Sequence, residues 1–302
     1  MGLRFAKLSP AGNTTILVLD PVPESVQAEV AAGLMNPAIL GGEQVGFVTL
    51  MAQGPIAATM RMMGGEFCGN AARSLGAYLA SIRHPSMRTT DDSSKSQGLI
   101  QVYGVDTPIL VQAELDEEEM PCWASCAFPG APKVDFFFVE TLSWASSGLS
   151  PNIRISPCVN PRDLLESWLG KVSLKLRPSV VAVVRLEGIT HISYALGLED
   201  EACIGVMFRY GLDEIVPLVH VAATNTFVWE SSCASGAAAV ALVYASAYGE
   251  AGCYDFKQPG GALSVTARPP DVEEEPSDSY ATVCGDVRLV AEGTVFIDIV
   301  SA

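Results

Sequence analysis

The chain has 302 residues, of which 49% are hydrophobic, so it can bury one large core or two medium ones. Its formal net charge is -16 and its 18 Lys and Arg residues are scattered. This excludes nucleic acid and anionic membranes as expected partners, because binding phosphate needs clustered positive charge. No apolar stretch reaches the roughly 18 residues of a membrane-spanning helix, and the start does not resemble a signal peptide. We therefore expect a cytoplasmic protein.

The eight cysteines show no regular spacing and do not resemble a disulfide framework. Cys122 and Cys126 form the only close pair, and no His lies near them. The three His residues are isolated from one another in the sequence. The sequence therefore predicts no metal site, and we expect no cofactor.

The first part of the chain predicts a sheet with two helices. Residues 3–20 read as two strands joined by the turn SPAGN, and a helix is expected over 24–35, where apolar residues recur at four-residue spacing behind a proline. Further strands are expected at 43–50, 56–63, 99–104 and 107–115. The polar segment 84–98 is expected to be a surface loop.

The same order of elements starts again after the acidic turn DEEEMP. Strands are expected at 123–128, 134–142, 180–186, 190–196, 219–230 and 294–300, a helix at 161–169 and a solvated loop at 269–280, while 200–212 is ambiguous. We place one half at residues 1–120 and a second at 121–290. Residues 291–302 are then a final strand.

Each half contains a cysteine at the expected start of a helix rich in small residues. The first motif is GGEFCGNAARSLGAYLA, around Cys68, and the second is SSCASGAAAVALVYA, around Cys233. Small residues follow both cysteines in register, and each motif follows a strand. Together with the shared element order, this favours an internal duplication.

A thiol at a helix start is suited to acid/base chemistry. The first N–H groups of a helix lack partners and carry the positive end of the helix dipole, so we expect the thiol to ionise easily. The same N–H groups can hold a substrate carboxylate. If the halves face each other, two such thiols can remove a proton from one face of a carbon and return one to the other, as a racemase requires.

Five motifs in order resemble the diaminopimelate epimerase superfamily of two-cysteine racemases and isomerases, which work without cofactor. These are SPAGNTTILV, EQVGFV, FCGNAAR, SSCASGAA and QPGGALSV. Within this superfamily the pattern is most similar to the histidine racemases of opine-type metallophore pathways. The resemblance implies an α+β fold of two pseudo-symmetric halves, each a curved, mostly antiparallel sheet around a central helix. It also implies that the final strand, at residues 291–302, returns to the first half.

The resemblance also implies the residues of the site. Cys68 and Cys233 match the acid/base pair of the family, and the expected substrate-binding residues are Asn13, Gln44, Glu66, Gly69, Asn70, Glu230, Ala234 and Ser235. The epimerases carry an Arg before the second cysteine that grips a carboxylate, whereas here Trp229 and Glu230 lead directly to Ser231. Diaminopimelate is therefore not the expected substrate.

These observations predict an isomerase that racemises an amino acid, first of all histidine. A homodimer is the one assembly considered, and the sequence leaves the oligomeric state open. Two alternatives remain open at this point. The same fold could act on another amino acid or isomerise a small carboxylic acid, or the cleft could belong to a ligand-binding or redox-sensing protein without catalysis.

Overall fold

The structure is a computed structural model of the chain. It describes residues 1–128, 136–144, 151–158, 203–209, 213–221, 226–269 and 279–298. The strands β9 (Phe136–Trp144) and β10 (Pro151–Cys158), which pair antiparallel, are described by their backbone only. The helix expected at 161–169 and the strands expected at 180–186 and 190–196 lie outside the described residues.

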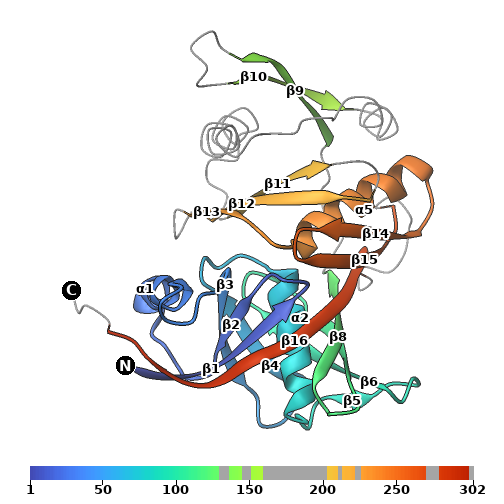
Figure 1. Ribbon diagram of the computed structural model, residues 1–302. Helices are drawn as coiled ribbons and strands as arrows, with labels where there is room; N and C mark the ends of the chain where they lie inside the picture. The colour runs from blue at the N-terminus through green and yellow to red at the C-terminus, as the bar shows by residue number, and fades with distance from the viewer. Residues whose placement is uncertain are drawn as a thin grey trace.

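The lower part of the molecule in Figure 1 is a ring of strands around one helix. Pairing runs in the order β1-β2-β3-β4-β6-β7-β8-β16, and β16 pairs back to β1, which closes the ring. The strands are β1 (Gly2–Pro10), β2 (Thr15–Val18), β3 (Gln44–Leu50), β4 (Ile56–Met62), β6 (Lys95–Val102), β7 (Ile109–Leu115), β8 (Pro121–Phe128) and β16 (Ala281–Phe296). Two pairings, β2–β3 and β4–β6, are parallel and the others are antiparallel, so the mostly antiparallel sheet is confirmed.

Helix α2 (Gly69–Ser81) passes through this ring, and every residue from Gly69 to Ala80 is buried. Small side chains allow the strands to come close on all sides. A Cβ atom at Gly76 would lie 2.8 Å from Cβ of Val111 on β7. A helix that is surrounded on all sides cannot be amphipathic, which explains its run of Ala and Gly.

The second helix of the site, α5 (Ala234–Tyr248), lies in the upper part of Figure 1. It packs against β14 (Gly252–Gln258), β15 (Gly261–Ala267), β16 and β11 (Cys203–Arg209). A separate sheet contains β11, β12 (Ile215–Val221) and β13 (Thr226–Trp229). The ambiguous segment 200–212 thus contains the strand β11, and the expected strand 219–230 is divided between β12 and β13.

Strand β16 connects the two regions, as the long red ribbon in Figure 1 shows. Its first residues pair with β8 and β15, and residues from Val287 to Phe296 pair with β1. The strand expected at 294–300 therefore begins much earlier, at Ala281. The division of the chain after residue 120 stays a prediction, although β8 pairs with β7 across that point.

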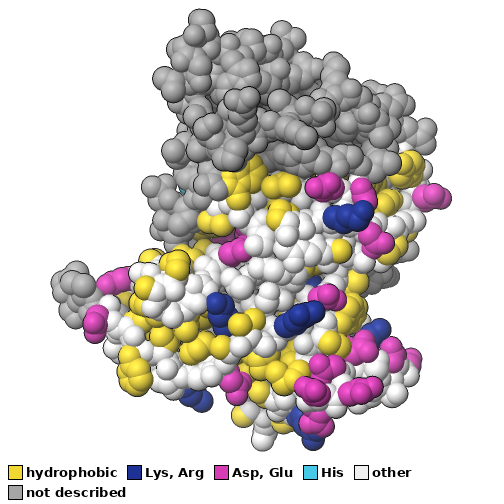
Figure 2. Space-filling model, in the orientation of Figure 1, with side chains coloured by type: hydrophobic (Ala, Val, Ile, Leu, Met, Phe, Trp, Pro, Cys, Tyr) yellow, Lys and Arg dark blue, Asp and Glu magenta, His cyan; other side chains and the backbone are white. Residues whose placement is uncertain are grey.

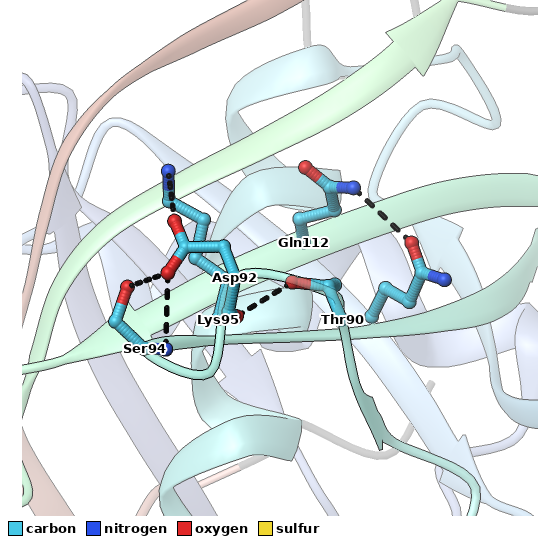
Figure 3. A network of polar contacts seen from close by, with 6 residues as sticks. Thr90, Asp92, Ser94, Lys95 and Gln112 are labelled. Carbon is cyan, nitrogen blue, oxygen red and sulfur yellow. Dashed lines mark hydrogen bonds and ion pairs between the residues drawn. The ribbon is translucent and has the colours of Figure 1, made fainter.

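Helix α1 (Glu24–Met35) lies outside the ring and has the expected bounds. The loop expected at 84–98 is wrong in part, because β5 (Arg88–Thr89) pairs with β6 to form a hairpin. The Asp92 side chain stabilises the turn of this hairpin, as Figure 3 shows. The Asp92 carboxylate accepts hydrogen bonds from the backbone and hydroxyl of Ser94 and pairs with Lys95 at 3.2 Å.

Acidic side chains are spread over the described surface in Figure 2, and they gather at the end of the ring near β5 and β6. This matches the acidic composition. No helix in the described ranges is long and apolar enough to cross a membrane.

Candidate active site

A cavity of about 430 Å³ lies where the first turns of α2 and α5 meet. Both sequence-predicted cysteines, Cys68 and Cys233, line it, so the structure brings together two residues that are far apart in the sequence. Its polar lining also includes Gln44 and the carboxylates of Glu43, Glu66 and Glu230. The apolar lining comes from Met63, Phe67, Met207, Val219, Val221 and Val228.

The two cysteines occupy equivalent positions at their helices. Each is the N-cap residue, with φ -130° and ψ 113° at Cys68 and φ -132° and ψ 109° at Cys233. The helix starts approach each other through small residues, since a Cβ at Gly69 would lie 2.9 Å from Cβ of Ala234 and 2.7 Å from the Phe128 ring. Glycine at position 69 is therefore required by this close approach.

The Cys68 thiol donates a hydrogen bond to Oε1 of Gln44 at 2.8 Å. The other end of this amide is fixed, because its Nε2 donates to Oδ1 of Asn13 at 2.5 Å and to the hydroxyl of Thr15 at 2.7 Å. The sulfur also accepts the Ala71 N–H at 3.4 Å. Asn13 and Gln44, both predicted as substrate-binding, are thus part of a network that ends on the first thiol.

The surroundings of Cys233 are different. Its backbone N–H donates to Oε1 of Gln258 at 2.7 Å, and its thiol is hydrogen-bonded to the Glu230 carboxyl group. Gln258 lies in the QPGG turn between β14 and β15, and its Nε2 is buried without a hydrogen-bond partner. Its proximity to Cys233 places the fifth sequence motif at the site.

Burial dominates the chemistry of both thiols. Loss of solvent raises the pKa of Cys68 and of Cys233 well above the ordinary value, and the negative charge of Glu230 raises both further. The expectation of easily ionised thiols was therefore wrong for the cavity as it stands. The helix N–H groups do favour the thiolate, but their effect is smaller than the cost of burial.

Glu66 and Glu230 bring carboxyl groups into this buried space. Burial raises the pKa of Glu230 to about 7, and it also raises the pKa of Glu66. The Oε2 atom of Glu66 is buried and has no hydrogen-bond partner. A cationic group in the cavity would satisfy both carboxylates and favour their charged forms.

The remaining predicted residues divide into two groups. Gly69, Ala234 and Ser235 stand at the first helical positions, and in the described structure their N–H groups make no hydrogen bond. By contrast, the Asn70 side chain is used internally, since its Nδ2 donates to the Ser232 carbonyl at 2.9 Å. Asn70 therefore joins α2 to the residue before Cys233, and only its backbone can face a ligand.

The orientation of the Asn70 amide is set by Arg73, which is fully buried. Its guanidinium donates to Oδ1 of Asn70 at 3.2 Å, to the Ala124 carbonyl at 3.0 Å and to the Asp286 carbonyl at 3.1 Å. Burial lowers the pKa of Arg73 to about 10. This side chain, which sequence reasoning missed, ties α2 to β8 and β16.

Sequence reasoning also missed Glu43 and Gln258. Glu43 stands directly before the predicted Gln44, and Gln258 is the first residue of the recognised QPGG motif. Their positions in or beside recognised motifs could have identified both as residues of the site. Among the described residues lining the cavity there is no Arg, Lys or His. The backbone N–H groups at the two helix starts are groups in this cavity that can bind an anion.

Comparison with known proteins finds relatives that align with nearly the whole chain. A histidine racemase from Fusobacterium nucleatum (strain ATCC 23726) is 27% identical over 299 residues, covering 98% of this chain and 97% of the relative. A histidine racemase from Staphylococcus aureus (strain Mu50) is 25% identical over 301 residues, covering 98% of each chain.

Two solved structures share the fold. A hydroxyproline epimerase from Agrobacterium vitis with bound trans-4-hydroxy-L-proline has a TM-score of 0.59 at 10% identity, covering 97% of this chain and 92% of that one. A probable proline racemase from Agrobacterium radiobacter K84 has a TM-score of 0.58 at 11% identity, covering 98% and 93%.

Fold, site and relatives together define an isomerase of the amino-acid racemase class. Within this class, the family described as the histidine racemase CntK N-terminal domain matches residues 2–143 and 180–296. The chain belongs to that family.

Proposed function

We propose that the chain is a cofactor-independent histidine racemase in which Cys68 and Cys233 act as the two bases. One ionised sulfur takes the α-proton, and the electron pair of the broken C–H bond is delocalised towards the substrate carboxylate. The thiol on the opposite face then gives its own proton to Cα. The product has the opposite configuration, and the protonation states of the two sulfurs are exchanged.

Carboxylate binding is assigned to the open N–H groups of Gly69, Ala234 and Ser235, with the Asn70 backbone beside them. Because they belong to two helix starts, they place positive dipole ends where negative charge grows during proton removal. The small residues at these positions let the carboxylate approach the backbone. The lack of a basic side chain among the described lining residues supports this assignment.

Glu66 and Glu230 are proposed to hold the positive charge of the substrate, either its ammonium group or a protonated imidazole. Such a charge also stabilises a nearby thiolate, which offsets part of the burial that raises both cysteine pKa values. The names of the relatives favour histidine as the amino acid. A racemase of another polar amino acid is the alternative that the same geometry allows.

One observation supports the proposal most strongly: two N-cap cysteines with matching backbone geometry line one cavity. A binding protein needs neither of these thiols. A double-bond isomerase would need no group to hold the substrate ammonium, whereas Glu66 offers a buried and unpartnered carboxylate oxygen.

The test is to incubate the protein with each L-amino acid in D2O and follow both configuration and deuterium at Cα. We expect histidine to racemise fastest and its D-isomer to contain deuterium. A panel of unsaturated carboxylic acids serves as the comparison. Turnover of such an acid without exchange into any amino acid would replace the proposal by the isomerase alternative.

A further inference from the structure

Glu43 makes a clamp between the two cysteine-bearing segments. Its Oε1 accepts the hydroxyl of Ser231 at 2.5 Å, and its Oε2 accepts the backbone N–H of Ser231 at 3.0 Å. Oε2 also accepts Nδ2 of Asn13 at 2.9 Å. The Ser231 hydroxyl and backbone N–H thus bind one carboxylate that lies 188 positions away in the sequence.

This clamp completes a continuous network of hydrogen bonds between side chains. It runs from the Cys68 thiol to Gln44, from Gln44 to Asn13, from Asn13 to Glu43, and from Glu43 to Ser231. Ser231 stands two residues before Cys233. Because the carboxylate can only accept, it sets the orientation of the Asn13 amide. The Gln44 amide beside Cys68 is held in addition by the Thr15 hydroxyl.

The segment that Glu43 holds has further contacts with the ring of strands. The Ser232 hydroxyl donates to the Pro10 carbonyl at 3.1 Å, and the Ser231 carbonyl accepts the Gly260 N–H at 2.7 Å. Gly260 in turn lies against Gly12, where a Cβ would be 2.5 Å from the Gly260 Cα. The two residues before Cys233 are thus held in place by contacts that lead to the N-terminal part of the chain.

We infer that Glu43 is a positioning residue that holds Cys233 opposite Cys68. Although it borders the cavity, its two oxygens are occupied by Ser231 and Asn13 rather than free for a ligand. The inference rests on the proposed two-thiol mechanism. Loss of the clamp moves the second sulfur, and a displacement of about 1 Å in a reacting group can cost on the order of 100-fold in rate.

Two variants separate the hydrogen-bonding role of Glu43 from its charge. Glu43→Leu keeps similar bulk but removes every acceptor. Glu43→Gln keeps Oε2 as an acceptor for Asn13 and for the Ser231 N–H, and its amide can donate to the Ser231 hydroxyl, which rotates to accept. We therefore expect Glu43→Leu to lower kcat about 100-fold with a small change in KM. Glu43→Gln should restore most of this activity.

The decisive measurement is the ratio of α-hydrogen exchange to racemisation in D2O, taken for each histidine enantiomer. In Glu43→Leu the thiol at position 68 keeps its own partners, so exchange without inversion should persist for one enantiomer and the ratio should rise at least about tenfold. Ser231→Ala, which removes only the hydroxyl contact, should give an intermediate ratio and serves if Glu43→Leu does not fold. Glu119→Gln, at the exposed pair with Arg83, is the control.

An increase in KM with unchanged kcat would make Glu43 a substrate ligand and overturn the inference. An unchanged ratio in both Glu43→Leu and Ser231→Ala would overturn it as well. If the wild-type protein neither racemises nor exchanges any amino acid, the proposed function itself fails, and this outcome is distinct from both.

Discussion

The two cysteines have nearly the same backbone conformation, but a different group faces the sulfur at each site. Cys68 donates to the neutral amide of Gln44, which is fixed by two further hydrogen bonds. Cys233 faces the carboxyl group of Glu230, whose own pKa burial raises to about 7. The helix starts are alike because both are N-capped by a cysteine before small residues, whereas the acceptors come from different elements.

This difference shows that duplication of a helix start does not duplicate its electrostatics. The backbone N–H groups supply the same positive dipole end to both sulfurs. The Glu230 carboxyl group beside Cys233 can ionise, whereas the Gln44 amide beside Cys68 stays neutral. Substitutions that make the two sites more alike test how much this difference contributes to stability and racemisation.

The largest effect on stability is expected from Glu230→Gln, which gives Cys233 a neutral amide neighbour like that of Cys68. The folded-state pKa of about 7 lies above the ordinary value of 4.5, so the wild-type protein loses stability as pH rises through this interval. The variant avoids this cost. The difference in unfolding free energy between variant and wild type should therefore rise by about 3 kcal/mol from pH 4.5 to pH 8.

Urea unfolding of both proteins across this range measures the difference directly. Groups that titrate equally in the two proteins cancel, and Glu66 is the neighbouring carboxyl group to monitor. A difference that is constant with pH would show that Glu230 titrates normally.

A smaller effect is expected from Gly69→Ala, which gives α2 the residue that α5 already has at its first position, Ala234. The added Cβ would lie 2.7 Å from the Phe128 ring, which packs edge-on against Phe67. The Phe128 ring is buried and in contact with Phe67, so it cannot move freely away from the added Cβ. We expect a loss of about 1–3 kcal/mol in unfolding free energy, together with reduced racemisation because the two helix starts are forced apart.

Gly33→Ala in α1 is the matched control, because no atom lies within 4 Å of the position that its Cβ would take. It should raise the unfolding free energy by about 0.5–1 kcal/mol without affecting racemisation. Equal destabilisation by both substitutions would mean that close contact is not the reason for glycine at position 69.

Local signals in the sequence predicted the helices well. The bounds of α1 follow from a proline before it and a four-residue apolar spacing, and α2 and α5 begin directly after the two cysteines. The hairpin at β5 was missed because its turn depends on side-chain contacts of Asp92 rather than on apolar periodicity.

What the sequence could not show depends on contacts between distant segments. The return of β16 to β1 joins residues at the two ends of the chain, and it was expected only from the family resemblance, because no local pattern marks it. The same holds for the clamp between Glu43 and Ser231. Both cysteines could be placed at helix starts, but their raised pKa values result from burial, which appears only when the cavity is assembled.

The central claim is that the two thiols serve opposite faces of one substrate carbon. Cys68→Ala and Cys233→Ala, each incubated with α-deuterated L- and D-histidine in water, test it most directly. We expect each variant to lose racemisation by about 100- to 10,000-fold, yet to exchange the α-deuterium of one enantiomer, and we expect the two variants to act on opposite enantiomers. Racemisation at the wild-type rate by either variant, or exchange of the same enantiomer by both, would contradict it.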